Sequence, residues 1–263
     1  STIVDEDGNE VDSIVTNEYR EVIDYDNIPE RLKQAFVAVE DERFYKHPGL
    51  DPQSIIVSAI ENFKAGGIVR GGSTLTQQLA RNTYLDNDQT YERKIREIYL
   101  ALEIEENLSK DEILGAYLNR VFMGQNSYGV QAAAKTYFDK DVSELNLAQC
   151  AALAGIVQSP SDNSLYKAIK VSEVTDQKIL GEFTIEGERY AAVYNPAPYE
   201  REVYVLDKML EKGYISKKEY EEAKNFDVAS SIVPAERTNT EVASYFNSLL
   251  ERQVVSKLME TYN

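Results

Sequence analysis

The chain has 263 residues, enough for one full domain, and its 45 acidic and 28 basic side chains give a formal net charge of −17. This charge argues against sequence-independent binding to nucleic acid and against electrostatic docking on an anionic membrane, since both need dense Lys and Arg. One cysteine and one histidine exclude an internal disulfide, a multi-Cys zinc site and a two-His metal motif.

The first third of the sequence predicts an extended lead-in and two helices. Residues 1–24 are polar and turn-rich. From Pro29 apolar residues recur at the helical period, and Glu40 lies at the edge of that apolar stripe. Asp51 before Pro52 is typical of a helix start, and Gly66-Gly67 of a helix end. The helix between them carries apolar residues on one side, namely Ile55, Ile56, Ala59, Ile60 and Phe63.

The remaining two thirds predict helix after helix, at residues 73–85, 90–107, 109–119, 128–138, 147–157, 198–212 and 216–225. In the helix at 90–107 the apolar face consists of Ile95, Ile98 and Leu102, and Arg93 and Glu97 project on the opposite side. The clearest exception is residues 183–193, where β-branched and aromatic residues flank Glu-Gly and predict a small hairpin. The predicted fold is mainly α-helical.

Individually, the candidate functional residues have ordinary explanations. Glu40-Asp41 beside an apolar face is either a solvated helix end or a carboxylate whose pKa is raised for acid or base work. Arg93 and Glu97 have the spacing of a surface ion pair, although Arg before Glu is the less favourable order. His47 before Pro48 fits a structural turn, and Cys150 in an apolar run fits a buried, inert thiol.

Five motifs in order are more specific. They read Glu-Asp-Glu-Arg-Phe-Tyr-Lys-His-Pro-Gly at 40–49, Gly-Gly-Ser-Thr-Leu-Thr-Gln-Gln-Leu-Ala-Arg-Asn at 71–82, Arg-Lys-Ile-Arg-Glu at 93–97, Lys-Asp-Glu-Ile-Leu through Tyr-Leu-Asn at 110–119, and Tyr-Gly-Val-Gln-Ala-Ala-Ala-Lys-Thr-Tyr-Phe at 128–138. With these motifs the chain resembles the peptidoglycan glycosyltransferases, the polymerase domains of class A penicillin-binding proteins. The match is dense over residues 24–160 and looser over 194–227.

The resemblance implies a lysozyme-like, two-lobed helical domain that polymerises lipid II into glycan strands. It implies that Glu40 is the general base, which takes the proton of the 4-hydroxyl of incoming lipid II as that oxygen attacks the growing chain. Polyprenyl pyrophosphate is then the leaving group. Cations must neutralise its charge, and Arg81, Arg93 and Lys94 suit that role.

The resemblance also assigns the other site residues. Glu97 is implied to be catalytic, either by orienting the cations or by holding a divalent metal, Mg or Mn, near the pyrophosphate. Asp41, Ser73, Gln78 and Asn82 are implied to bind substrate, since neutral donors and acceptors suit sugar hydroxyls and phosphate oxygens. Phe44, His47 and Gly49 are expected to shape the turn of the first motif, and Asn119, Gln131 and Tyr137 to support the catalytic lobe.

The implied setting is the extracytoplasmic face of the bacterial cell membrane. We expect residues 1–24 to follow a membrane anchor that this sequence lacks, 25–228 to form the glycosyltransferase domain, and 229–263 to form a linker and helix towards an absent transpeptidase domain. Residues 55–69 correspond to a membrane-facing jaw, although burial against the domain explains their apolar pattern equally well. Lipid II and the growing glycan are the implied partners, together with other cell-wall synthesis proteins. We expect no Ser-x-x-Lys nucleophile motif of a transpeptidase in this chain, and therefore polymerisation without cross-linking.

Two positions depart from the family pattern, which usually has Glu at the position of Gly115 and Gly at that of Asp139. Residues 167–194 have no equivalent that we recognise. Two other readings stay open. One is a lysozyme-like hydrolase, which the cluster of Arg81, Arg93 and Lys94 disfavours. The other is a non-catalytic module that binds the lipid-linked precursor, which intact Glu40 and Glu97 disfavour.

Overall fold

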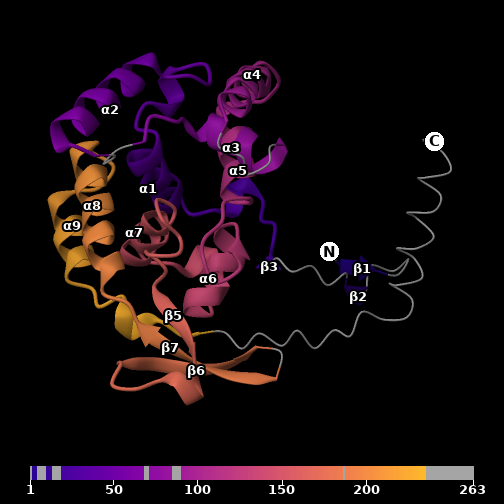
Figure 1. The fold of residues 1–263 in the computed structure, drawn as a ribbon, viewed down its shortest axis with the longest axis vertical. Coiled ribbons are helices and arrows are strands. Elements are labelled where there is room, and N and C mark those ends of the chain that lie inside the picture. The colour runs from indigo at the N-terminus through magenta and orange to yellow at the C-terminus, as the bar shows by residue number, and fades with distance from the viewer. Residues whose placement is uncertain are drawn as a thin grey trace.

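The computed structural model describes residues 2–4, 10–13, 19–67, 71–84, 90–185 and 187–234. Within these ranges the fold is mainly helical, as predicted (Figure 1). The helices are α1 Glu30–Glu40, α2 Pro52–Ala65, α3 Leu75–Tyr84, α4 Tyr91–Asn107, α5 Lys110–Leu118, α6 Val130–Phe138, α7 Leu147–Ile156, α8 Ala197–Glu211 and α9 Lys217–Lys224. The strands are β1 Thr2–Val4, β2 Glu10–Ser13, β3 Tyr19–Arg20, β4 Ser127–Tyr128, β5 Tyr166–Lys170, β6 Ile179–Ile185 and β7 Glu188–Tyr194.

Helix ends lie within about two residues of the predicted positions where the capping signals were strong. Asp51 accepts a hydrogen bond from the Ser54 backbone N–H at 3.2 Å and caps α2. Capping boxes form at Ser109 with Glu112 and at Ser216 with Glu219. Of the linker and helix predicted at 229–263, all but residues 229–234 lie outside the described residues.

The predicted hairpin forms from β6 and β7, which pair antiparallel. A third strand, β5, pairs with the other edge of β7 and completes a three-stranded sheet that the sequence analysis did not predict. The sheet lies at the opposite end of the domain from α2 and α4 (Figure 1). Phe183 and Tyr166 pack edge to face across it, with ring centroids 5.7 Å apart.

One hydrophobic core holds the head of the domain together. Helix α1 packs between α7 and α8, and its residues Leu32 and Phe36 are fully buried. The Phe36 ring meets that of Tyr117 on α5 edge to face at 6.1 Å. This packing fixes the end of α1, where Glu40 lies, because helix α1 has little room to shift in a close-packed core.

Helices α2 and α4 expose apolar side chains. On α2, Ile56 is 61% and Phe63 88% exposed, so burial against the described part of the domain does not explain its apolar pattern. On α4, Ile95 and Tyr99 are each 68% exposed, whereas Glu97 is completely buried. An apolar helix face ordinarily packs inward, but the inward face of α4 carries buried Glu97 with partly buried Arg93 and Lys94, beside buried Ala101.

The structure also explains the two departures from the family pattern. A side chain at position 115 would place its Cβ 3.3 Å from the ring of Tyr25, whose hydroxyl donates to Asp111 at 2.9 Å. Gly115 therefore leaves room for the lead-in to pack on α5. Asp139 ends α6 with φ of 51°, in the left-handed region where glycine is easiest and aspartate is tolerated.

Candidate active site

The first two motifs are joined by hydrogen bonds around Glu40, the last residue of α1. The backbone N–H of Leu75 donates to Asp41 Oδ2 at 3.0 Å. The hydroxyl of Thr74 donates to the carbonyl oxygen of Gly49 at 2.6 Å. These bonds fix the start of α3 against the turn that follows Glu40, and so set where the side chains of α3 point.

His47 holds that turn, as predicted for it. Its Nε2 lies 3.0 Å from both carboxylate oxygens of Asp41, and both residues are buried. Asp41, His47 and Asp51 place their donor atoms within 4.8 Å of one another. Both carboxylates are already engaged, however, because Asp41 binds His47 Nε2 and the Leu75 backbone, and Asp51 caps α2 and pairs with Arg43 at 3.0 Å. His47 Nδ1 is buried without a hydrogen-bond partner among the described residues. This cluster is therefore a structural one, and Asp41 contributes to it more than to the open part of the site.

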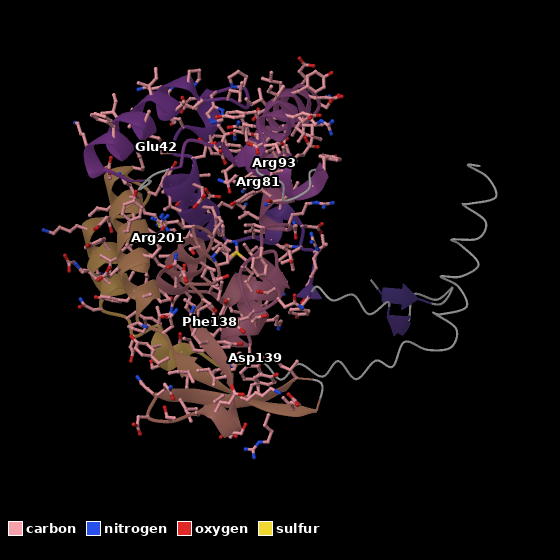
Figure 2. All side chains as sticks on the ribbon, viewed as in Figure 1. Glu42, Arg81, Arg93, Phe138, Asp139 and Arg201 are labelled. Carbon is pink, nitrogen blue, oxygen red and sulfur yellow. The ribbon has the colours of Figure 1, made fainter. Side chains whose placement is uncertain are left out.

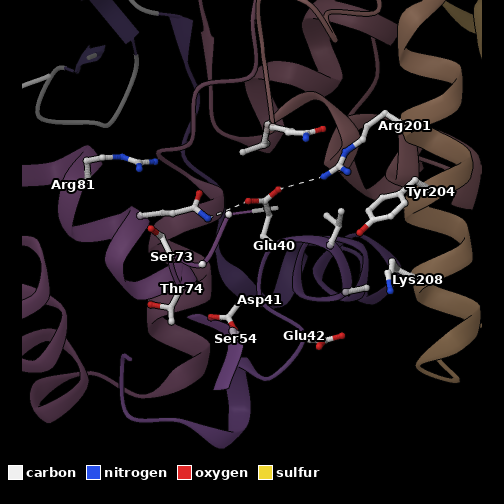
Figure 3. A pocket seen from close by; sticks show the side chains of 17 residues that line it. Glu40, Asp41, Glu42, Ser54, Ser73, Thr74, Arg81, Arg201, Tyr204 and Lys208 are labelled. Carbon is white, nitrogen blue, oxygen red and sulfur yellow. Dashed lines mark hydrogen bonds and ion pairs between the residues drawn. The ribbon is translucent and has the colours of Figure 1, made fainter. Parts of the chain in front are cut away.

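Glu40 lies at the centre of a cavity of about 450 Å³ (Figure 3). Gln78 Nε2 donates to Glu40 Oε2 at 3.0 Å, and the Gln78 amide oxygen accepts from the buried hydroxyl of Tyr117 at 3.1 Å. Because Tyr117 donates to the oxygen of that amide, the amide nitrogen is left to face Glu40. On the other side, the guanidinium of Arg201 lies 3.9 Å from Glu40 Oε1.

Burial raises the pKa of Glu40 above its ordinary value. The hydrogen bond from Gln78 and the charges of Arg201 and Arg81 lower that pKa, and the neighbouring charge of Asp41 raises it. The direction of the sum is upward because the loss of hydration is the largest effect. A carboxylate with an increased proton affinity, held by a hydrogen bond in its ionised form, is suited to accept a proton.

A second cluster of charges lies behind Ser73. Glu97 is fully buried and accepts hydrogen bonds from Arg93 at 3.3 Å and from Lys94. Lys94 Nζ also donates to Ser73 Oγ at 3.0 Å, and Ser73 lines the cavity. The cations of Arg93 and Lys94 are thus held in position by one buried carboxylate next to the cavity.

The structure brings most of the predicted residues together. Ser73, Gln78 and Arg81 line the cavity around Glu40, and Asp41 forms part of its wall. The adjoining cluster consists of Arg93, Lys94 and Glu97, which do not line the cavity. Asn82 is exposed and does not line the cavity, so its predicted substrate contact has no support from this geometry.

Helix α8 supplies three cavity residues that the sequence analysis did not identify, namely Arg201, Tyr204 and Lys208. Arg201 and Arg81 approach Glu40 from opposite sides (Figure 3), and Figure 2 shows where the two arginines lie in the domain. The Arg201 guanidinium lies 4.6 Å from the centre of the Tyr204 ring, a cation–π contact. The three α8 residues are spaced by three and four positions, which places them on one face of a helix. A helical projection of residues 197–211 shows them together, and this is the sequence signal that could have identified them.

The supporting residues take the predicted roles. Asn119 exchanges two hydrogen bonds of 2.9 Å with the backbone of Ile23 and so attaches the lead-in to α5. The Gln131 amide donates to Asp141 at 2.9 Å, and the Tyr137 hydroxyl donates to the Met123 carbonyl at 2.8 Å. These residues join segments of the head and do not line the cavity.

Two further features, a Ser-x-x-Lys pair and the single cysteine, are explained by packing and hydrogen bonding and not by catalysis. Ser164 and Lys167 do have the Ser-x-x-Lys spacing, which the sequence analysis passed over. However, Ser164 is buried and donates to the Tyr166 carbonyl at 2.8 Å, and Lys167 binds the Ser161 carbonyl. The pair therefore has no nucleophile geometry. Burial raises the pKa of Cys150 to about 12, in agreement with an inert thiol.

Comparison with known families agrees with this site. The model of the family described as "Transglycosylase" matches residues 7–184. The chain belongs to the transglycosylase family. This membership confirms the resemblance that the five motifs carry, and identifies the chain as a peptidoglycan glycosyltransferase by family.

This transglycosylase is 39% identical to penicillin-binding protein 1A of Clostridium botulinum (strain Hall), across 100% of this chain and 30% of that protein. It is 40% identical to penicillin-binding protein 1A of Clostridium perfringens (strain 13), across 100% of this chain and 36% of that protein. The chain thus spans about a third of the length of these relatives. A 2.6 Å crystal structure of penicillin-binding protein 1A from Haemophilus influenzae aligns with 97% of this chain and 24% of its own, at 22% identity and a TM-score of 0.42.

Proposed function

We propose that this chain polymerises lipid II into glycan strands, by transferring the growing polyprenyl-pyrophosphate-linked chain to the 4-hydroxyl of incoming lipid II. Glu40 acts as the general base and polyprenyl pyrophosphate leaves. The observation that carries the proposal is a largely buried carboxylate with a raised pKa, in a cavity lined by Arg81, Arg201 and Lys208 and next to the cluster of Arg93 and Lys94. A base and an anion-binding site are the two parts that this reaction requires.

The proton of the attacking hydroxyl passes to Glu40. Glu40 reaches the cavity from the end of a tightly packed helix, which holds the carboxylate in place, and Gln78 orients it through its amide. The acceptor oxygen then forms the new glycosidic bond at the anomeric carbon while the bond to pyrophosphate breaks. Arg201 and Lys208 line the α8 side of the cavity and are suited to bind the pyrophosphate of the incoming lipid.

The leaving pyrophosphate binds on the Ser73 side. Lys94 and Arg93 lie behind Ser73, and Arg81 reaches into the cavity from α3. Glu97 positions the first two cations, because its two carboxylate oxygens each pair with one of them. As a metal site of protein ligands Glu97 does not fit, because both its oxygens accept from cations and no other acidic or histidine ligand groups with it in the described residues. A divalent ion would have to take most of its ligands from pyrophosphate and water.

The exposed apolar residues of α2 form the contact with the lipid interface, and the exposed face of α4 extends it. In the described part of the chain no helix is both long and apolar enough to cross a bilayer. Contact through Ile56 and Phe63 on α2 and through Ile95 and Tyr99 on α4 needs no basic surface, which agrees with the net charge of −17. Both helices lie at the same end of the domain (Figure 1). We place this surface on the extracytoplasmic face of the membrane, where lipid II is used.

The other two readings are less well supported. A hydrolase of the common type uses a second carboxyl group, but Asp41 is bound to His47 and Leu75, and Glu42 pairs with Lys212 at 2.6 Å. A pure binding module has no need of a base with a raised pKa.

The test is polymerisation of labelled lipid II in detergent, with divalent metal or with EDTA, analysed as a glycan ladder on a gel. Glu40→Gln should abolish the ladder, and Glu221→Gln, an exposed position on α9, should leave it unchanged. Cleavage of preformed glycan would identify a hydrolase. Bound lipid II without polymer from the unmodified chain would identify a binding module.

The membrane contact is tested separately by flotation with vesicles of zwitterionic lipid. Ile56→Ser with Phe63→Ser, and Ile95→Ser with Tyr99→Ser, should each reduce the bound fraction several-fold. Val22→Ser, which is 75% exposed in the lead-in, serves as the control. Equal flotation of all four proteins would refute the contact.

A further inference from the structure

A second cavity lies away from Glu40, where the start of α8 meets the end of β7 and the segment after α9. It has a volume of about 90 Å³ and is lined in part by Tyr194, Tyr199, Glu202, Phe226 and Asp227. Because a water molecule occupies about 30 Å³, the space admits a group of about three heavy atoms. Nothing in the proposed polymerisation uses this cavity.

Glu202 is the unusual residue of this cavity. It is only 3% exposed, and its Oε1 has no hydrogen-bond partner. Glu202 shares the inward face of α8 with Val205, Leu206 and Met209, all of them buried. A carboxyl group without a partner costs free energy at such a position, where an apolar side chain would pack without that cost. A ligand that supplies the missing partner would recover this cost on binding.

The lining of the cavity decides the chemistry of that ligand. Two acidic side chains, Glu202 and Asp227, and three aromatic rings line it, and no Lys, Arg or His is among the described lining residues. Asp227 uses Oδ1 to accept from the Ser230 backbone N–H at 3.2 Å. The ring of Tyr194 also contacts Lys178, whose Nζ lies 5.0 Å from the ring centre and which does not line the cavity. Carboxylates and aromatic walls together favour a small organic cation over an anion or a neutral sugar.

We infer that this cavity binds a primary alkylammonium group, with Glu202 as its counter-ion and the rings of Tyr199 and Phe226 as its walls. Ammonium hydrogens satisfy the unpartnered carboxylate oxygen, and the first carbons of the chain fill the apolar part. The same chemistry is carried by a small free amine and by a lysine side chain. The inference is independent of the function proposed for Glu40.

Binding of a cation requires Glu202 to be ionised, so it must depend on pH. Burial raises the pKa of Glu202 to about 8. The ionised fraction is then about one tenth at pH 7 and about nine tenths at pH 9, where alkylammonium is still charged. The cavity should therefore bind alkylammonium about tenfold more tightly at pH 9 than at pH 7. The other titratable side chains that line it are Asp227, Tyr194 and Tyr199.

The experiment is a titration of the ¹⁵N-labelled chain with ethylammonium, followed by amide chemical shifts at pH 7 and pH 9. Saturable shifts are expected in residues around Glu202, with an affinity about tenfold higher at pH 9. Ethanol, which has the same heavy-atom count without the charge, should give none. Glu202→Gln should abolish the shifts, whereas Glu200→Gln, an exposed position on the same helix, should retain them.

A second arm distinguishes the two sources of the group. Nα-acetyl-lysine amide presents the ammonium on a lysine side chain, so binding of this probe as tightly as ethylammonium assigns the cavity to a lysine of a partner. Binding of ethylammonium alone assigns it to a small amine. Absence of saturable shifts with both probes at pH 9, or equal shifts in Glu202→Gln, would overturn the inference, and the amide spectrum of the variant shows whether it is folded.

Discussion

Replacing Gln78 by leucine should move the acid limb of the pH–rate profile upward. The reaction needs ionised Glu40, and the Gln78 amide donates to that ion at 3.0 Å, which lowers its pKa. A hydrogen bond to a charged group is worth about 1.5–3 kcal/mol. At about 1.4 kcal/mol per pKa unit this equals one to two units. Because the cavity is open to solvent, we expect the lower end, a shift of about one unit.

The assay is the initial rate of lipid II polymerisation from pH 5 to pH 9 for Gln78→Leu and Tyr117→Phe. Tyr117 does not line the cavity, and its hydroxyl bond of 3.1 Å only orients the Gln78 amide. Tyr117→Phe should therefore shift the limb in the same direction by less, with little change of rate at high pH. If both variants lose rate equally at every pH and the limb stays in place, Gln78 does not stabilise the charge of Glu40.

Three further predictions concern stability, measured by urea denaturation. Gly115→Ala should change the free energy of unfolding by less than about 1 kcal/mol, since the gain in helix propensity opposes the contact with Tyr25 at 3.3 Å, whereas Gly115→Glu should lower it clearly. Asp139→Gly should raise it by roughly 1 kcal/mol, because the φ of 51° strains any side chain. Glu202→Gln should flatten its pH dependence. The folded chain keeps a proton on Glu202 between the ordinary pKa of 4.5 and about 8, so the unmodified chain loses stability as pH rises through that window, by at most about 5 kcal/mol.

The helices and the first half of the site could be predicted from the sequence because their signals are local. Capping residues and apolar periodicity define where helices begin and end, as at Asp51 and Ser109. The residues around Glu40 were predicted because the five motifs carry the family resemblance, and that resemblance implies their roles. Ser73, Gln78 and Arg81 lie within nine residues of one another on one helix and the turn before it.

The α8 wall of the cavity could not be predicted in the same way. Arg201 is 161 positions after Glu40, and only the packing of α1 against α8 brings them within 3.9 Å. The third strand, β5, was missed for a similar reason, since its partner β7 follows after a long connection. The orientation of α4 was not evident either, because the pattern of its apolar residues gives the two faces of the helix but not which one packs inward.

The orientation of helix α4 connects the net charge of the protein to its proposed reaction. A chain with a net charge of −17 cannot attract a pyrophosphate through its overall field, so the cations that bind it must be held at fixed positions. Glu97 does this for Arg93 and Lys94 from the inward face of α4, where its side chain is completely buried. Burying that face exposes Ile95 and Tyr99 at the end of the domain where α2 exposes Ile56 and Phe63. The orientation of α4 about its own axis therefore accounts both for the anion site that we propose beside Glu40 and for the apolar surface that we assign to the lipid interface.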